Sequence, residues 1–427
     1  MHKFLMFLFC VVMLSRHLSG EDTGNYYTDA VFDERIKTVQ LYKEGWNLSY
    51  PVMKLFSDEK LILHFDLLDE NIEDYYYTFY HCSKDWEKSD VFSSEYLEGF
   101  PENPIEEYTA SFNTTVNYFH YKLVFPNERV KLTISGNYIL FVYADGHPED
   151  PVLTRRFIVT EDAANVEIDM HRPLVSSNYN TGQQVDFRVN IGGLDLTDPY
   201  RNIYSFILQN GRWDNAKKNL KPDITGGNEL IYNSLSEENI FDAGNEFRYF
   251  DIRSIKYLSE YLVSIDYLAP NYHIYLRPSE NRQLRPYFHS QDFNGKFYIA
   301  SAEGRDADTD ADYVYVYFTL PAPYLQSDSR VYVMGYLSDW KTGKNNLMTY
   351  NHSKGQYECT MFLKQGVYNY EYMVARNNVP VIPSGFEGSH YETENDYMIL
   401  VYYRNPRDRY DRLLTTASAN TFNNLSR

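Results

Sequence analysis

An acidic loop late in the chain carries the spacing that comes nearest to a metal-binding motif. Its aspartates occupy alternate positions, as the first ligands of a calcium-binding loop do; they are Asp306, Asp308, Asp310 and Asp312. The sixth position of such a loop is Ala311 here instead of glycine, and the twelfth is Tyr317 instead of a bidentate glutamate. We therefore expect a solvated loop without a metal, with a cation site as the alternative.

A histidine beside a cysteine is the second pattern that could do chemistry. His81, Cys82 and Asp85 lie close together in the chain, and a base next to a thiol can activate it as a nucleophile. Successive residues of a strand point to opposite faces, so His81 and Cys82 cannot easily share a proton. We expect a packed strand end. Cys359 lies in a different predicted domain, so a disulfide with Cys82 is disfavoured, and both are expected to be small buried side chains.

Other catalytic signatures are absent from the sequence. The chain has no glycine-rich phosphate loop, no paired histidines at zinc-ligand spacing and no nucleophile elbow. With 59 acidic residues, any two carboxylates could be nominated as a glycosidase pair, so their presence discriminates nothing. The sequence predicts a protein that is not an enzyme and uses no cofactor.

The composition is that of a folded, acidic protein. Of 427 residues, 43% are hydrophobic and 17% aromatic, which is far from the composition of a disordered chain. The formal net charge of −19 repels phosphate backbones, so nucleic-acid binding is not expected.

The first twenty residues have the parts of a secretory signal peptide. Lys3 supplies the positive start, residues 4–14 the apolar stretch, and residues 18–20 a cleavage site before Glu21. A membrane anchor is the alternative, but this apolar stretch falls short of the roughly 20 residues that cross a bilayer. We expect export with cleavage, and no membrane-spanning helix in the mature chain.

Alternation of apolar and polar residues is the commonest pattern, and it predicts antiparallel strands. It marks residues 185–191 and 357–363 as half-buried strands. Runs that are apolar on both faces predict inner strands at residues 138–143, 313–320 and 397–403. Helical patterning is scarce, with one short helix expected at residues 254–261.

These elements predict an all-β protein of three consecutive antiparallel β-sandwich domains with immunoglobulin-like architecture. We place the domains at residues 21–162, 163–308 and 309–415, followed by a disordered tail at 416–427. The boundary near residue 308 is the least defined, because residues 296–301 could pair with residues 313–319 across the acidic loop.

The third predicted domain resembles the glycogen-binding-type immunoglobulin-like modules. The resemblance rests on residues 330–340 and 366–372. Such modules place aromatic rings on sugars, and the residues that could form a similar platform are Tyr336, Trp340, Lys344 and Asn346. In the alternative interpretation, Trp340 packs over the edge of a sandwich that is kept for its fold alone.

Several unbroken strings carry a stronger resemblance. They occupy residues 77–86, 111–114, 135–138, 153–157, 209–215, 243–251 and 403–413. On these strings the chain, from about residue 36 to residue 413, is identified as a member of the plug protein family of the type IX secretion system of Bacteroidota, formerly a domain of unknown function.

The resemblance implies a non-enzymatic periplasmic protein without membrane spans, peripheral to the outer membrane. It would dock on the very large outer-membrane translocon β-barrel of that system (SprA/Sov type) and close its pore from the periplasmic side. Contact candidates, chosen on composition, are Arg155, Arg156, Arg212, Trp213, Arg404, Arg407 and Arg409. Their alternative role is to make interdomain or turn-fixing contacts. An envelope carbohydrate-binding protein and a hydrolase of envelope sugars or peptides remain the competing functions.

Overall fold

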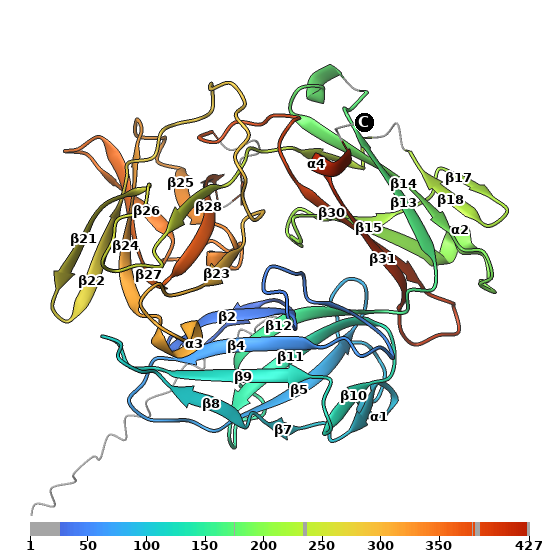
Figure 1. Ribbon diagram of the computed structural model, residues 1–427. Coiled ribbons are helices and arrows are strands. Elements are labelled where there is room, and N and C mark those ends of the chain that lie inside the picture. Colours follow the sequence, from blue (N-terminus) through green and yellow to red (C-terminus); the bar gives the residue numbers. More distant parts are fainter. Residues whose placement is uncertain (1–25, 175, 234–236, 378, 381–384, 425–427) are drawn as a thin grey trace, which may run out of the picture.

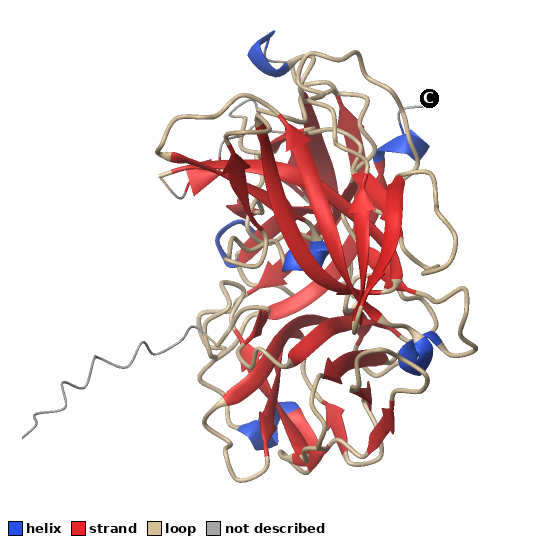
Figure 2. Ribbon diagram, turned by 90° about the vertical axis from the view of Figure 1, so that its left-hand side faces the viewer, coloured by secondary structure: helices blue, strands red, loops and turns tan. Residues whose placement is uncertain are grey.

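The computed structural model describes residues 26–174, 176–233, 237–377, 379–380 and 385–424. Strands dominate it, and its α-helices are single turns of four residues (Figure 2). The prediction of an all-β fold is confirmed. The predicted signal peptide lies outside the described residues. Within the described part, no helix has the length and apolar character that crossing a bilayer requires.

The first unit, drawn in blue to teal at the bottom of Figure 1, packs two main sheets against each other. One has the order β1-β12-β11-β5-β7 with β3 on β12, the other has the order β2-β4-β9-β8, and β10 pairs with β6 separately. Phe79 of one main sheet lies 4.9 Å from Phe125 of the other, between ring centroids. The elements are β1 (Ala30–Val31), β2 (Ile36–Lys43), β3 (Val52–Lys54), β4 (Leu61–Leu67), β5 (Tyr75–Cys82), α1 (Ser93–Tyr96), β6 (Leu97–Gly99), β7 (Asn103–Pro104), β8 (Glu107–Ala110), β9 (Phe119–Phe125), β10 (Val130–Leu132), β11 (Gly136–Ala144) and β12 (Pro151–Thr160).

The second unit is built from two separate stretches of the chain. Its sheets have the orders β13-β14-β18-β17, with β19 on β14, and β16-β15-β30-β31. Phe241 and Tyr397 meet between these sheets at 5.2 Å. The elements are β13 (Asn165–His171), the 3-10 turn η1 (Ser176–Asn178), β14 (Gly182–Asn190), α2 (Pro199–Asn202), β15 (Ile203–Gln209), β16 (Lys217–Leu220), β17 (Ile224–Gly226), β18 (Glu229–Tyr232), β19 (Ile240–Asp242), β30 (Asp396–Tyr403), β31 (Arg412–Asn420) and α4 (Thr421–Asn424).

The third unit has one long sheet in the order β20-β28-β25-β26-β27-β24-β22-β21, with β23 and β29 on β28. Its two ends share one core, in which Phe250 lies 5.5 Å from Phe318. The elements are β20 (Arg248–Asp251), β21 (Leu262–Leu268), β22 (Asn271–Leu276), β23 (Phe297–Ile299), α3 (Ala307–Asp310), β24 (Tyr313–Pro321), β25 (Ser329–Met334), the 3-10 turn η2 (Tyr336–Ser338), β26 (Leu347–Asn351), β27 (Gln356–Lys364), β28 (Gly366–Arg376) and β29 (Val379–Pro380).

The predicted boundary near residue 308 is wrong, because the third unit is inserted into the second. Strands β20 to β23 precede that boundary, yet β20 and β23 pair with β28, and β22 pairs with β24. Strand β30 returns to pair with β15 along its whole length (Figure 1). An apolar run shows that a strand is buried on both faces, but it does not show which strand lies beside it.

Three smaller expectations also need correction. Residues 416–420, expected in a disordered tail, continue strand β31, and α4 follows; residues 425–427 lie outside the described part. Strand β23, within residues 296–301, pairs with β28 rather than with β24. No helix forms at residues 254–261. There the Ser254 hydroxyl accepts the backbone N–H groups of Lys256 and Tyr257, a local turn that competes with a helix.

An apolar seam joins the first and second units. It consists of buried side chains from β12 and from the β15-β30-β31 sheet, namely Ile158, Phe206, Leu208, Met398, Leu400, Tyr402 and Leu413. The Tyr402 hydroxyl donates to Asn137 Oδ1 at 2.7 Å, which satisfies its buried polar end.

Candidate functional site at the junction of the three units

The three units meet around a cavity of about 350 Å³. Strand β12 of the first unit and the turn after β15 of the second contribute to its wall, as does η2 of the third. Six of the residues predicted to bind a partner or a sugar line it: Arg155, Arg156, Arg212, Trp213, Tyr336 and Trp340. The tertiary structure therefore brings together residues that were predicted for two separate roles.

Arg155 connects the first unit to the third. It is 5% exposed, and its guanidinium donates to the carbonyls of Ala30 and Thr154 at 3.3 and 3.0 Å. The same group forms an ion pair with Asp339 at 3.2 Å. Because Arg155 is buried and its guanidinium already has protein partners, it serves as a contact between units and is not available to dock on another protein.

Arg156 connects the first unit to the second through aromatic rings. Its guanidinium donates to the Tyr27 carbonyl at 3.0 and 2.7 Å. The guanidinium carbon lies 4.4 Å from the ring centroid of Trp86 and 5.9 Å from that of Trp213. These two indoles meet edge to face at 4.9 Å. Burial lowers the pKa of Arg156, as expected for a cation that is enclosed by rings.

Arg212 connects the second unit to the third. Its guanidinium pairs with Asp214 at 2.7 Å and Glu371 at 3.6 Å, and its carbon lies 4.0 Å over the Trp340 ring. Burial raises the pKa of Glu371 to about 7, and Arg212 opposes that shift. The preceding Gly211 has a φ of +69°, and a Cβ there would lie 2.2 Å from a ring carbon of Tyr50, so the tight turn that presents Arg212 requires glycine.

The arginines of the loop between β30 and β31 lie elsewhere. Arg404 pairs with Asp411 at 3.5 Å within the loop. Arg409 forms an ion pair with Glu95 of the first unit and lies 5.6 Å from the ring of Phe92. Arg407 and Arg409 are exposed, Arg404 is half-buried, and the other four contact candidates are buried or half-buried.

The predicted sugar platform does not share one open face. Tyr336 and Trp340 meet edge to face at 5.9 Å, but Arg212 covers the Trp340 ring and the Tyr336 hydroxyl donates to the Asn210 carbonyl at 3.1 Å. Asn346 is buried, and its amide donates to backbone carbonyls of the same unit. Lys344 is exposed. Sugar binding by this unit remains a prediction, and the contacts of Tyr336, Trp340 and Asn346 do not support it.

The acidic loop is only partly solvated. Asp306 caps α3, with its carboxylate accepting the Asp308 backbone N–H at 3.0 Å, and Asp310 accepts that of Arg305 at 2.8 Å. Asp312 is buried and accepts two hydrogen bonds from Thr115 at 2.9 Å. Asp306, Asp310 and Asp312 thus accept hydrogen bonds from the protein, and among the described residues the four aspartates are not gathered around one point.

The histidine and cysteine of β5 do not form a catalytic pair. His81 contacts the Ser89 hydroxyl at 2.7 Å and the Ser135 carbonyl at 3.0 Å. Cys82 and Cys359 are both buried free thiols, as predicted, and burial raises the pKa of each to about 12. Neither thiol is prepared to act as a nucleophile.

A polar seam between the first and third units was not predicted. Asp66 of β4 and Lys364 of β27 form an ion pair at 2.7 Å, with each side chain 1% exposed. His120 and Tyr313 also contact the Asp66 carboxylate, each at 2.7 Å. The sequence held a signal for this seam, since β4 carries His64 and Asp66 within an otherwise apolar strand, and buried charges require partners.

Comparison with known proteins identifies the family. The model of the type 9 secretion system plug protein 1st domain matches residues 36–161, which cover most of the first unit. The crystal structure of a hypothetical protein from Parabacteroides merdae ATCC 43184 is similar over nearly the whole chain, with 33% identity and a TM-score of 0.88. The alignment covers 92% of this chain and 99% of that one. A search of curated proteins finds no match. The chain belongs to the type 9 secretion system plug protein family.

Proposed function

We propose that this protein is a periplasmic plug that docks on the giant outer-membrane translocon barrel of the type IX secretion system and closes its pore. The observation that carries the proposal is membership of the plug family. The family implies a structural role without catalysis, and the buried arginines form ion pairs between units.

The tertiary structure supports a steric role. A plug must keep its shape against a wide opening, and the three units are tied pairwise by Arg155, Arg156 and Arg212 around the central cavity. The apolar seam and the polar seam add buried contacts on either side. Because the third unit is inserted into the second, it is held by two chain connections instead of one.

The docking surface that we propose is the exposed edge of the third unit at β21, on the side of that unit away from β15 and β30 of the second unit (Figure 1). Strand β21 is the last strand of its sheet, so one row of its backbone groups is left without a neighbouring strand. Its Val263, Tyr267 and Leu268 are each more than half exposed, as are Tyr257 and Leu258 just before it. Exposed aromatic and aliphatic side chains beside a sheet edge suit pairing with another β-protein.

The first test is affinity purification of the tagged, exported protein from a native envelope extract, with mass spectrometry of what co-purifies. We expect one very large outer-membrane barrel in near-equal amount. Recovery of no barrel with folded bait contradicts the proposed function. N-terminal sequencing of the same material should begin at Glu21 if the predicted signal peptide is cleaved.

A second test locates the surface. A photo-crosslinking amino acid at Tyr257 or Tyr267 should link the protein to the barrel. The matched control carries the same amino acid at Lys354, on an exposed turn of the same unit. This control should not crosslink to the barrel. Crosslinking from Lys354 but not from the β21 edge would show that docking uses a different surface.

A further inference from the structure

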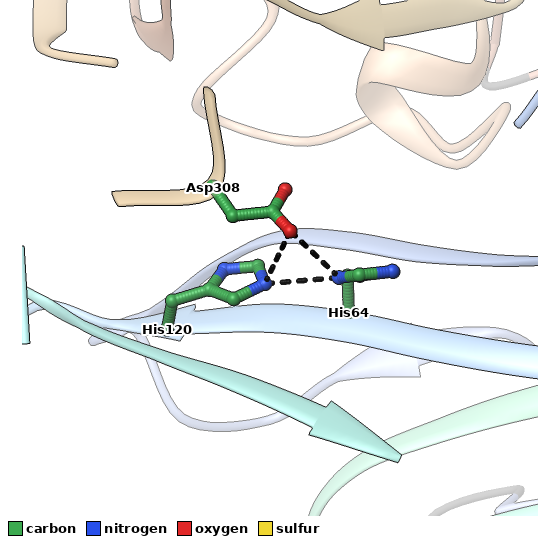
Figure 3. Close-up of side chains that lie close together, drawn as sticks. All are labelled: His64, His120 and Asp308. Atoms are coloured by element: carbon green, nitrogen blue, oxygen red, sulfur yellow. Dashed lines mark hydrogen bonds and ion pairs between the residues drawn. The ribbon is translucent and has the colours of Figure 1, made fainter. Parts of the chain in front are cut away.

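Two histidines and an aspartate from different units converge beside the polar seam (Figure 3). His64 Nδ1 of β4 and His120 Nε2 of β9 lie 2.9 Å apart. Asp308 Oδ2, from α3 of the third unit, lies 3.8 Å from the first nitrogen and 3.6 Å from the second. His64 and His120 belong to neighbouring strands, so the rigid sheet of the first unit holds both imidazoles.

The hydrogen bonds around His120 orient it as a ligand. Its Nδ1–H donates to Asp66 Oδ1 at 2.7 Å, so the lone pair of Nε2 is directed at the shared centre. The other Asp66 oxygen is held by Lys364 and Tyr313, each at 2.7 Å. A carboxylate behind a histidine is the usual support of a metal-bound imidazole, because it fixes the tautomer and makes the ring a better donor.

The spacing and the donor types select the class of metal. Bonds of 2.0–2.1 Å to a tetrahedral ion separate its ligand atoms by about 3.3 Å, and the three atoms here lie 2.9 to 3.8 Å apart. Two imidazole nitrogens and one carboxylate oxygen suit zinc, or copper and nickel, better than the all-oxygen preference of calcium. The Asp308 side chain is 44% exposed, which leaves a route for an ion and a place for a water ligand.

We propose that His64, His120 and Asp308 bind one divalent transition-metal ion, with zinc as the expected ion, and that this ion joins the first unit to the third. The site is independent of the aspartate spacing that first suggested calcium, since only Asp308 of those four residues takes part. It is also independent of docking on a barrel, because it lies in this chain alone.

The test uses the full exported chain without a histidine tag, freed of metal by a chelator. Calorimetric titration with zinc should show one ion per chain. At zinc one hundred times its dissociation constant, the Tm should rise by about 3 °C for a chain of this size. Cobalt should give the visible absorption of a tetrahedral site, which a hydrogen bond between the two imidazoles cannot produce.

Two variants locate the ion, and a third is the matched control. Asp308→Asn and His64→Gln should each weaken zinc binding at least about 10-fold, since loss of even a supporting residue costs about 10–100-fold. His171→Gln, which removes a histidine paired with Asp186 in the second unit, should leave zinc affinity unchanged. If His64→Gln does not fold, Asp308→Asn decides, because its side chain lies partly at the surface. No binding, or binding that both site variants leave intact, overturns the proposal.

Discussion

The first unit is attached to its two neighbours by contacts of opposite character. Toward the second unit it offers an apolar seam, in which Ile158 belongs to one buried cluster with Phe206 and Leu400. Toward the third unit it offers a polar seam, in which Asp66 and Lys364 are buried as an ion pair. Apolar burial is non-directional and proportional to area, whereas a buried ion pair holds only when each partner is in place. The polar seam therefore specifies position more narrowly than the apolar one.

The largest effect is expected from breaking one side of the polar seam. Lys364→Met leaves Asp66 buried without its cation and should lower the free energy of unfolding by about 3–5 kcal/mol. The control is Lys354→Met, which breaks an exposed pair with Glu358 and should cost less than about 1 kcal/mol. Urea unfolding measures both. Equal losses would mean that the buried pair has no special role.

The apolar seam should be damaged by truncation instead of by charge imbalance. Leu400 is fully buried, and Leu400→Ala should cost about 2–5 kcal/mol through lost burial and a residual cavity. Leu284, which is 93% exposed, is the control, and its alanine variant should stay within about 0.5 kcal/mol of the natural chain. A loss below about 1 kcal/mol at Leu400 would show that the two units do not depend on this seam.

Acid should weaken the third unit through Glu387. Burial alone would raise the pKa of this carboxyl, but Arg248 at 3.0 Å and Arg282 at 2.5 Å outweigh it and lower the pKa to about 2. Because the folded pKa lies below the ordinary value of 4.5, the stabilisation is present above pH 4.5 and is lost as the pH falls from 4.5 toward 2. The Tm of the natural chain should fall in this window.

The Glu387→Gln variant should be less stable than the natural chain at neutral pH. Its Tm should fall less than that of the natural chain as the pH falls from 4.5 toward 2. The control is Glu280→Gln, which removes an exposed pair with Arg285 and should leave the profile unchanged. An identical profile for Glu387→Gln would assign the acid sensitivity to other carboxyls.

The smallest effect is expected where a charge pair crosses between units at the surface. Arg409 of the second unit meets Glu95 of the first, with both side chains about 40% exposed or more. Arg409→Ala should cost less than about 1 kcal/mol, and high salt should erase the difference, because exposed pairs are screened. If Arg409→Ala lowered the free energy of unfolding by more than about 2 kcal/mol at every salt concentration, this ion pair would contribute as much as a buried one.

Element types were readable from local pattern. The alternation at residues 185–191 and 357–363 predicted β14 and β27, and the apolar run at 313–320 predicted β24. Both follow from the two-residue period of a strand, which local sequence records. The short helix α3 was missed because residues 306–312, which contain it, were interpreted as a solvated loop.

The candidate site could be predicted only in part. The arginines at 155, 156 and 212 were singled out on composition, and in the structure each of them contacts a residue of another unit. The sequence could not show that they line one cavity, because strand β12, which carries Arg155 and Arg156, and the turn that carries Arg212 belong to different units. His64 and Asp308, separated by more than half the chain, were never considered together.

Strand periodicity, side-chain type and family strings are local properties, so they were sufficient to predict an all-β chain of the plug family with buried thiols. The insertion of the third unit into the second and the meeting of Asp308 with His64 and His120 could be seen in the folded structure alone. Those outcomes depend on which strands pair across the chain, for example β30 with β15. Backbone hydrogen bonds between strands are the same for every sequence, so the packing of side chains on whole sheet faces determines which strands pair.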